Sequence, residues 1–339
     1  MMKLTTRMAD VLLYAPNRAP CAVDLSDNTN QWGAAPSAMR ALKDAPVALA
    51  TRYPPVYADE LKRALAAYLD VDVSTIVTGC GSDDVLDATM RAFGMPGSAV
   101  SYAEPTFPMI PTFARMNGLE PAPVRLKAAW ELDAQALLSR RAALTYICSP
   151  NNPTGRAFGP DVISGVVSEA SGVIVIDEAY AEFADWSAVP LLAANERLVV
   201  VRTMSKAWGL AGLRIGYGAC STPDLAREIE KARGPYKVNA AANAAALAAL
   251  QDDAGWMRDR VRDARESRAC LARRLAAMGL EAVPSDANFV FVPMSGGVAV
   301  EKAMRERGVA IRAFREGIRI TVGPWPLMES CLEALAACV

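Results

Sequence analysis

The chain of 339 residues contains no histidine. Serine–histidine–aspartate triads, cysteine–histidine pairs and metal sites with histidine ligands are therefore excluded within this chain. Any proton transfer has to use lysine, tyrosine, aspartate, glutamate, cysteine or a bound cofactor. This absence restricts the possible chemistry more than any other feature of the composition.

Three further absences concern location and partners. No apolar run approaches the roughly 18 residues that a membrane span requires, and the N-terminus lacks an apolar segment followed by a small-residue cleavage site. The net charge is −1 without a block of basic residues, so we expect neither a membrane nor a nucleic acid as partner. The seven cysteines are far apart and form no CxxC pair, which predicts reduced thiols in a cytosolic protein and no metal site.

The composition is that of an ordinary globular protein, with 52% hydrophobic and 22% charged residues. Short β-branched runs alternate with helical patterns between about residues 74 and 220. Continuous apolar runs such as GVIVID (172–177) are typical of a sheet covered on both faces. We therefore predict an α/β fold with a mostly parallel sheet between helices. The expected strands are 76–78, 99–102, 144–148, 173–177, 198–202 and 215–217, and the expected helices are 58–69, 83–93, 132–140 and 160–170.

The pattern changes after about residue 236. A stretch rich in alanine and arginine, 240–278, predicts one or two amphipathic helices that end near Gly279. Strands are then expected at 289–292 and 318–322, and helices near 298–307 and 327–337. This is a smaller α+β unit. The predicted organisation is an N-terminal arm that joins the small domain (1–32), a large domain (33–236) and a small domain (237–339).

The segment TMSKAWGLAGLRIGYG (203–218) follows a predicted strand, so Lys206 is expected at the carboxyl edge of the sheet, where open α/β folds bind ligands. Burial of a lysine lowers its pKa, and a neutral amine can form an imine. Thr203, Ser205 and Arg214 offer hydroxyls and a guanidinium that suit a phosphate. A surface lysine with a structural arginine is the alternative.

The segment GVIVIDEAYAEF (172–183) places Asp177 at the end of a buried strand, where its charge needs a partner. A protonated pyridine nitrogen is such a partner, and Tyr180 is close enough in sequence to reach an oxygen of the same ring. The alternative is a helix-capping aspartate with a core tyrosine. A Walker-B segment has the same form, but no GxxxxGK[ST] accompanies it.

Two further segments also follow predicted strands. In YICSPNNPTGRAF (146–158), Asn152 offers an amide donor within a turn. In TGCGSDDVLDATMRAF (78–93), we expect Gly81, Ser82 and Asp83 to present backbone N–H groups to a phosphate at a helix N-terminus. A plain turn and an ordinary N-cap are the alternatives.

These four segments resemble the cofactor motifs of the fold-type I, class I/II aminotransferases, which depend on pyridoxal 5′-phosphate (PLP). The likeness is closest to the histidinol-phosphate aminotransferase branch, through SPNNPTG (149–155), DEAY (177–180) and SKAWGLAGLRIGYG (205–218), and it extends from about residue 14 to the C-terminus. The resemblance implies a seven-stranded sheet in the large domain, PLP as cofactor, an amino donor and a 2-oxo acid as substrates, and a homodimer with shared active sites.

The resemblance also implies a role for each matching residue. Lys206 would hold PLP as a Schiff base and shuttle a proton, and Asp177 would pair with the ring nitrogen. Asn152 and Tyr180 would bond the ring oxygen. The cofactor phosphate would be held by Ser82, Asp83, Ser205 and Arg214, with Phe107 stacked on the ring and Tyr53 reaching the neighbouring subunit's cofactor.

The substrate residues are also expected from the resemblance. Arg319 would bind the α-carboxylate, Arg312 and Tyr14 would meet the phosphate of histidinol phosphate, and Asn28 belongs to the N-terminal motif SDNTNQWG. Thr29 stands where the family usually has glutamate, and the loop between the two arginines is short. An aminotransferase for aromatic or other amino acids, a PLP decarboxylase of the O-phosphothreonine type and a non-catalytic PLP-fold sensor module therefore stay open as alternatives.

Overall fold

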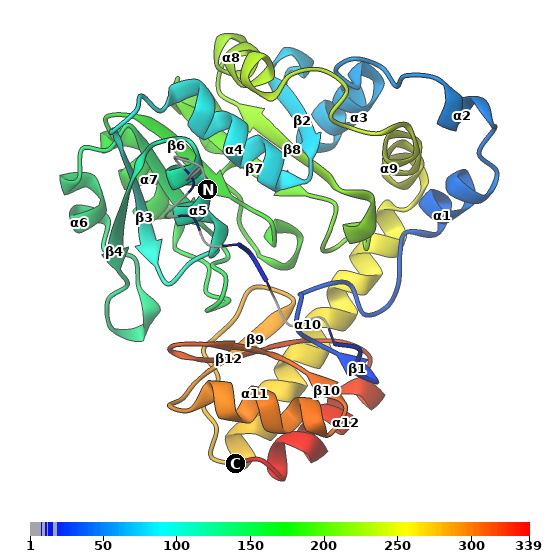
Figure 1. The fold of residues 1–339 in the computed structure, drawn as a ribbon, viewed down its shortest axis with the longest axis vertical. Helices are drawn as coiled ribbons and strands as arrows, with labels where there is room; N and C mark the ends of the chain where they lie inside the picture. The colour runs from blue at the N-terminus through cyan, green and yellow to red at the C-terminus, as the bar shows by residue number, and fades with distance from the viewer. Residues whose placement is uncertain (1–7, 9–10, 12, 16–18) are drawn as a thin grey trace, which may run out of the picture.

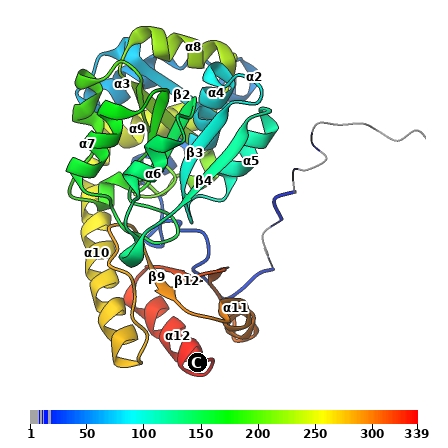
Figure 2. The same cartoon turned by 90° about the vertical axis from the view of Figure 1, so that its left-hand side faces the viewer.

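The computed structural model describes residues 8, 11, 13–15 and 19–339. A larger body with a central sheet and a smaller body with short strands are joined by the long helix α10 (Ala254–Ala277), as Figure 1 shows. Figure 2, turned by 90°, shows α10 running along one side of both bodies.

Seven strands in the order β2-β8-β7-β6-β5-β3-β4 form the central sheet. All of them run the same way except β8, which is antiparallel to both of its neighbours, so the predicted mostly parallel sheet is confirmed. The strands are β2 (Ile76–Cys80), β3 (Ala99–Glu104), β4 (Glu120–Arg125), β5 (Leu144–Cys148), β6 (Val173–Asp177), β7 (Leu198–Thr203) and β8 (Ile215–Cys220).

Helices cover both faces of this sheet, and the side chains of its strands alternate between two hydrophobic cores. In β6, Ile174 and Ile176 enter one core, while Val173 and Val175 enter the other. The run GVIVID is therefore apolar throughout because both faces of its strand are buried. The helices of this body are α1 (Pro36–Lys43), α2 (Ala48–Thr51), α3 (Asp59–Leu69), α4 (Ser82–Phe93), α5 (Met109–Met116), α6 (Ala134–Ser139), α7 (Pro160–Glu169), α8 (Pro223–Arg233) and α9 (Ala240–Asp252).

Five of these elements, β4, α1, α2, α5 and α8, were not among the predicted ones. Strand β4 has the sequence EPAPVR, and its prolines cannot donate ladder hydrogen bonds. It lies at the edge of the sheet, where only one neighbour has to be paired. Helices α1 and α8 both begin at proline, which is favourable in the first turn of a helix.

The smaller body contains a three-stranded antiparallel sheet in the order β11-β12-β9 and a parallel pair of β1 and β10. Helices α11 and α12 pack beside them (Figure 1). Its elements are β1 (Val23–Asp24), β9 (Phe289–Pro293), α11 (Gly297–Glu306), β10 (Val309–Ala310), β11 (Arg312–Phe314), β12 (Gly317–Thr321) and α12 (Trp325–Ala336). Strand β1 precedes the larger body in the chain and pairs with β10 in this smaller body.

The stretch 240–278 forms two helices, which meet at Asp253. The carboxylate of Asp253 accepts hydrogen bonds from the backbone N–H and the hydroxyl of Ser37, at 2.7 and 2.8 Å, which ties the junction to α1. Helix α9 packs against α1 and α3 in the larger body. The chain therefore leaves the larger body at the start of α10, after Asp253. The domain boundaries at residues 32 and 236 stay predictions.

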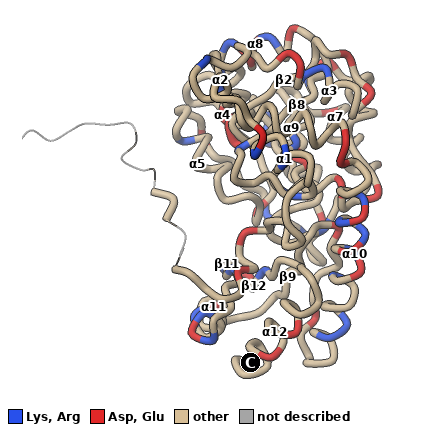
Figure 3. The backbone as a smooth tube through the Cα atoms, turned by 90° about the vertical axis from the view of Figure 1, so that its right-hand side faces the viewer, with Lys and Arg blue, Asp and Glu red and all other residues tan. Residues whose placement is uncertain are grey.

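Charges of both signs alternate along α10, as Figure 3 shows. Two pairs three residues apart, Arg260 with Asp263 at 2.8 Å and Arg262 with Asp259 at 2.9 Å, stabilise the exposed side of this helix modestly. Among the residues that the structure describes, no helix combines the length and the apolar character needed to cross a membrane.

Candidate active site

Three adjacent parallel strands bring the predicted residues to one edge of the sheet. Strands β5, β6 and β7 are in register there, with Cys148 beside Asp177 and Asp177 beside Val201. Asn152, Asp177 and Lys206 come at or just after the carboxyl ends of these strands. The site therefore lies at the edge where α/β sheets bind their ligands.

Lys206 has the properties expected of an amine that forms imines. Burial and, after it, the Arg319 cation lower the pKa of Lys206 to about 7 from the usual 10.5, while Asp83 and Asp177 oppose the shift. Its Nζ donates a hydrogen bond to the backbone oxygen of Asp27 at 3.0 Å and lies 5.8 Å from the centre of the Tyr180 ring. A neutral amine is thus available near pH 7.

Asp177 is 3% exposed, and both of its carboxylate oxygens accept hydrogen bonds. The Tyr146 hydroxyl donates to Oδ2 at 2.7 Å, and the Ala179 N–H donates to Oδ1 at 3.1 Å. Burial raises the pKa of Asp177 to about 6, an effect that the Tyr146 and Ala179 hydrogen bonds reduce. The expected cationic partner is not supplied by the described part of the chain, where Asp177 forms no salt bridge, so the carboxylate is suited to a cationic group of a ligand.

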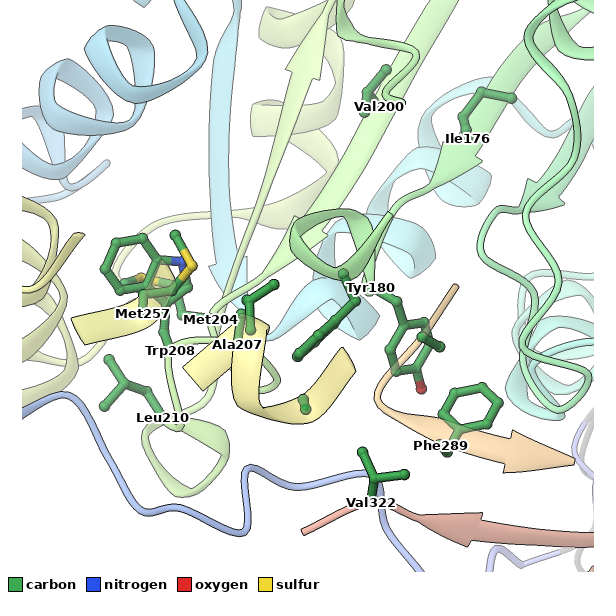
Figure 4. Packing of buried hydrophobic residues seen from close by; sticks show 14 of the residues in the cluster. Ile176, Tyr180, Val200, Met204, Ala207, Trp208, Leu210, Met257, Phe289 and Val322 are labelled. Atoms are coloured by element: carbon green, nitrogen blue, oxygen red, sulfur yellow. The ribbon is translucent and has the colours of Figure 1, made fainter. Parts of the chain in front are cut away.

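Tyr180 and Asn28 are adjacent in the site. The Asn28 amide donates to the Tyr180 hydroxyl at 2.9 Å, and Asn28 is itself held by Thr321 through its N–H and its Oδ1, at 2.9 and 3.1 Å. Phe289 of β9 lies edge-on to the Tyr180 ring, with 5.1 Å between the centroids, and Figure 4 shows the two rings side by side. The smaller body thus fixes the position of Tyr180.

Arg319 is a buried cation without a carboxylate partner among the described residues. It donates to Asn152 Oδ1 and to the backbone oxygen of Ser26, both at 2.5 Å, and its Nε has no partner in the described part of the chain. Its guanidinium carbon lies 5.4 Å from the ring centres of Phe289 and Phe314. Burial lowers the pKa of Arg319 to about 10, so it remains a cation at neutral pH and favours an anionic ligand.

Arg312 and Arg319 are cross-strand neighbours, paired in register between β11 and β12. Their side chains have different partners, since Arg312 forms an ion pair with Asp27 at 3.1 Å. Arg312 has a carboxylate partner, whereas Arg319 has none among the described residues. The two cations on adjacent strands suit a ligand with more than one negative charge.

Helix α4 begins at Ser82, beside Arg214. As the first residues of the helix, Ser82 and Asp83 have N–H groups without an acceptor inside it, which suits an anion. Arg214 lies 3.4 Å from the Asp83 carboxylate. The expectation for Gly81 is wrong in one respect, because its N–H donates to the Arg214 and Gly79 oxygens instead of facing a ligand. Its φ of +80° explains why glycine is required at this turn.

The remaining predicted residues lie in different surroundings. The hydroxyls of Thr203, the last residue of β7, and Ser205 lie 2.9 Å apart, and half-buried Phe107 precedes α5 at the carboxyl side of β3. Tyr53 is 85% exposed and packs on Tyr236 with 5.0 Å between ring centres, so it does not contact this chain's own site. Tyr14 is 55% exposed.

Several residues of the site were missed by the sequence reasoning. Tyr146 and Asp27 lie inside quoted motifs, but no spacing rule shows that a strand tyrosine contacts the next strand's aspartate or that an N-terminal residue contacts Arg312. Thr321 comes two residues after Arg319 and so lies on the same face of β12. The alternation of side chains along a strand could have predicted this position from the sequence.

Behind the site, Glu178 forms a buried ion pair with Arg202. Two guanidinium nitrogens of Arg202 donate to one Glu178 oxygen at 2.8 and 3.0 Å, and Ser187 donates to the same oxygen at 2.8 Å. This ion pair stabilises the turn after β6, and Tyr180 is part of that turn. Among the described residues, no group of His, Cys, Asp and Glu side chains is arranged to hold a metal ion.

The family model of class I and II aminotransferases matches residues 21–335, and the chain belongs to this family. The match spans all four segments from which the resemblance was inferred, whereas the roles of the individual site residues stay predictions. The seven-stranded α/β architecture is confirmed by solved relatives of the same family.

The similar proteins carry consistent names. A histidinol-phosphate aminotransferase of Pseudomonas aeruginosa is 37% identical over 92% of this chain and 88% of its own length. A histidinol-phosphate aminotransferase of a Nostoc species is 32% identical over 95% and 94%. The structure of the histidinol-phosphate aminotransferase of Sinorhizobium meliloti in complex with pyridoxal 5′-phosphate covers 100% of this chain and 98% of its own, at 26% identity and a TM-score of 0.87.

Proposed function

We propose that this chain binds PLP on Lys206 and transfers amino groups between an amine and a 2-oxo acid, most specifically between histidinol phosphate and 2-oxoglutarate. The observation that carries the proposal is the position of Lys206 and of buried Asp177 at the same edge of the sheet, at or just after the ends of the adjacent strands β7 and β6, where Asp177 forms no salt bridge with any described residue. The names of the similar proteins, and the cofactor in one of their structures, support it.

The side chains present fit each part of PLP. The Asp177 carboxylate suits the ring nitrogen, and the Asn152 amide and the Tyr180 hydroxyl suit the ring oxygen. The cofactor phosphate would be held at the N-terminus of α4 by the N–H groups of Ser82 and Asp83, assisted by the side chains of Thr203, Ser205 and Arg214. Phe107 would cover one face of the ring.

When bound, PLP withdraws electrons from the carbon that carries the substrate amine and makes that carbon acidic. The chain then has two tasks. Lys206 would act as the base that takes the proton from that carbon and holds it on Nζ for its return. Asp177 would keep the ring nitrogen protonated. Catalysis without histidine is thereby possible, because the base is an amine whose pKa burial has lowered to about 7.

Two arginines support the substrate assignment. Glutamate and 2-oxoglutarate carry an α-carboxylate, whereas histidinol phosphate carries a phosphate ester on the carbon that takes its place. Arg319 has an open Nε and would bind either group. We assign the phosphate to Tyr14 and to Arg312, the cross-strand neighbour of Arg319. Asn28 donates to the Tyr180 hydroxyl and would keep that side chain in place.

The proposed assembly is a homodimer in the cytoplasm. Tyr53 is 85% exposed next to the half-exposed Tyr236, a position from which it would reach a second subunit's cofactor phosphate. All seven cysteines are free, which supports a reducing compartment.

Borohydride reduction of the purified, PLP-loaded protein tests the cofactor site. We expect peptide mapping to find the pyridoxyl group on Lys206, and finding it on another lysine would refute the assignment. Assays of histidinol phosphate, phenylalanine and glutamate with 2-oxo acid acceptors then test the substrate. Preferential conversion of histidinol phosphate supports the proposal, whereas carbon dioxide release without an acceptor would identify a decarboxylase.

A further inference from the structure

Tyr146 is a buried polar residue for which neither the motifs nor the family comparison provides a role. It lies in the middle of β5, is 1% exposed, and is among the largest fully buried side chains. A phenylalanine would fill nearly the same volume in this core without a hydroxyl to satisfy. The hydroxyl therefore calls for an explanation, and its hydrogen bond to Asp177 Oδ2, at 2.7 Å, provides one.

We propose that Tyr146 is a positioning residue that holds the Asp177 carboxylate ionised and in one orientation for the cofactor's ring nitrogen. The inference rests on the role proposed above for Asp177. The Ala179 N–H binds Oδ1 and the Tyr146 hydroxyl binds Oδ2, so donors on two different segments hold the two oxygens. A carboxylate held at both oxygens cannot rotate, and it still has lone pairs for a third donor.

The charges around Asp177 show why a donor is needed. Burial, Asp83 on α4 and Glu178, the residue after β6, all favour the protonated carboxyl. Against them stand the Tyr146 hydroxyl, the Ala179 N–H and the ammonium form of Lys206. The Tyr146 hydrogen bond is the largest of the effects that lower the pKa of Asp177.

A tyrosine is suited to this task in a protein without histidine. Burial, and next the Asp177 charge, raise the pKa of Tyr146 well above its usual value, so its hydroxyl stays protonated throughout the range in which the protein works. A histidine in this place would change its own charge near neutral pH. With tyrosine as the donor, the hydrogen bond to Asp177 does not depend on a second titration.

The test is the affinity of the cofactor-free protein for PLP between pH 5 and 9, with each variant and its wild-type reference carrying Lys206→Ala so that titration of that amine does not contribute. In the wild-type reference, affinity should fall as pH drops through about 6, where Asp177 gains its proton. In Tyr146→Phe we expect this acid limb to move up by about one to two pH units, the value of one hydrogen bond to a charged group. At pH 7 the affinity should be about two- to tenfold lower.

Tyr102→Phe is the matched control. Tyr102 is the in-register neighbour of Tyr146 on β3 and is 4% exposed, and it has no role in the proposed site. Its variant should keep the wild-type acid limb. If the limb of Tyr146→Phe coincides with those of the wild type and Tyr102→Phe, Tyr146 is merely a core residue and the inference is refuted.

Two additional variants separate the inference from its premise. Asp177→Ala should abolish the acid limb, and a limb that persists there would refute the role of Asp177 itself. If Asp177→Ala behaves as expected while Tyr146→Phe does not, only the present inference fails. Should Tyr146→Phe not fold, 3-fluorotyrosine at position 146 keeps the packing and donates a stronger hydrogen bond. It should move the limb to lower pH, and an unchanged limb would refute the inference.

Discussion

Replacing Arg319 with glutamine should change the pH at which Lys206 captures PLP. Capture requires the neutral amine. With a pKa of about 7, about half of Lys206 is neutral at pH 7, compared with about one part in 3,000 for a lysine at the usual 10.5. The capture rate of the cofactor-free protein should therefore rise with pH up to about 7 and then level off.

Arg319 contributes to this shift because, after burial, it has the largest effect on the Lys206 ammonium. Removing its charge makes the ammonium less unfavourable, so the pKa of Lys206 should rise by about one unit. At pH 7 the neutral fraction, and with it the capture rate, should then fall about fivefold. Glutamine keeps an amide that can donate to Asn152, which limits other changes.

Stopped-flow absorbance of PLP capture across pH 5.5–10 measures both effects. Arg312→Gln is the control, since Arg312 is on the adjacent strand but pairs with Asp27 and is not among the influences on Lys206. A wild-type rate that continues to rise towards pH 10 would refute the lowered pKa. If the capture rate has the same pH midpoint in Arg319→Gln and in the wild type, the electrostatic role of Arg319 is refuted.

Two further predictions concern specificity and stability. Arg312→Gln should raise KM about tenfold or more for phosphorylated amines while leaving KM for unphosphorylated ones near its original value, and steady-state kinetics on both classes would reject the phosphate assignment if the two changed equally. Glu178→Gln leaves Arg202 buried without its carboxylate, so the free energy of unfolding should fall by about 3–5 kcal/mol in denaturant titrations. Asp224→Asn, which breaks an exposed pair with Arg227, should cost less than about 1 kcal/mol, and an equally small loss in Glu178→Gln would contradict the value assigned to the buried pair.

Much of the fold and of the site could be predicted from the sequence alone, because local patterns carried the information. The continuous apolar runs of β5, β6 and β7 predict strands buried on both faces, and the polar residues after them are expected together, since parallel strands end at one edge. Lys206, Asp177 and Asn152 could thus be assigned to one site. Strand β4 could not be predicted, because EPAPVR is tolerated as a strand only at a sheet edge, and position in the sheet is a property of the whole fold.

What the sequence by itself determined is the chemistry available: one lysine after a buried strand, an aspartate at the end of another, and no histidine. Only the tertiary structure decided the pKa values and the hydrogen bonds of those groups. The pKa of Lys206 depends on burial and on Arg319, which lies more than a hundred residues away in the chain, and Asp177 depends on a tyrosine of the adjacent strand. Electrostatic and hydrogen-bond energies depend on distance and solvent exposure, and neither quantity exists until the chain has folded.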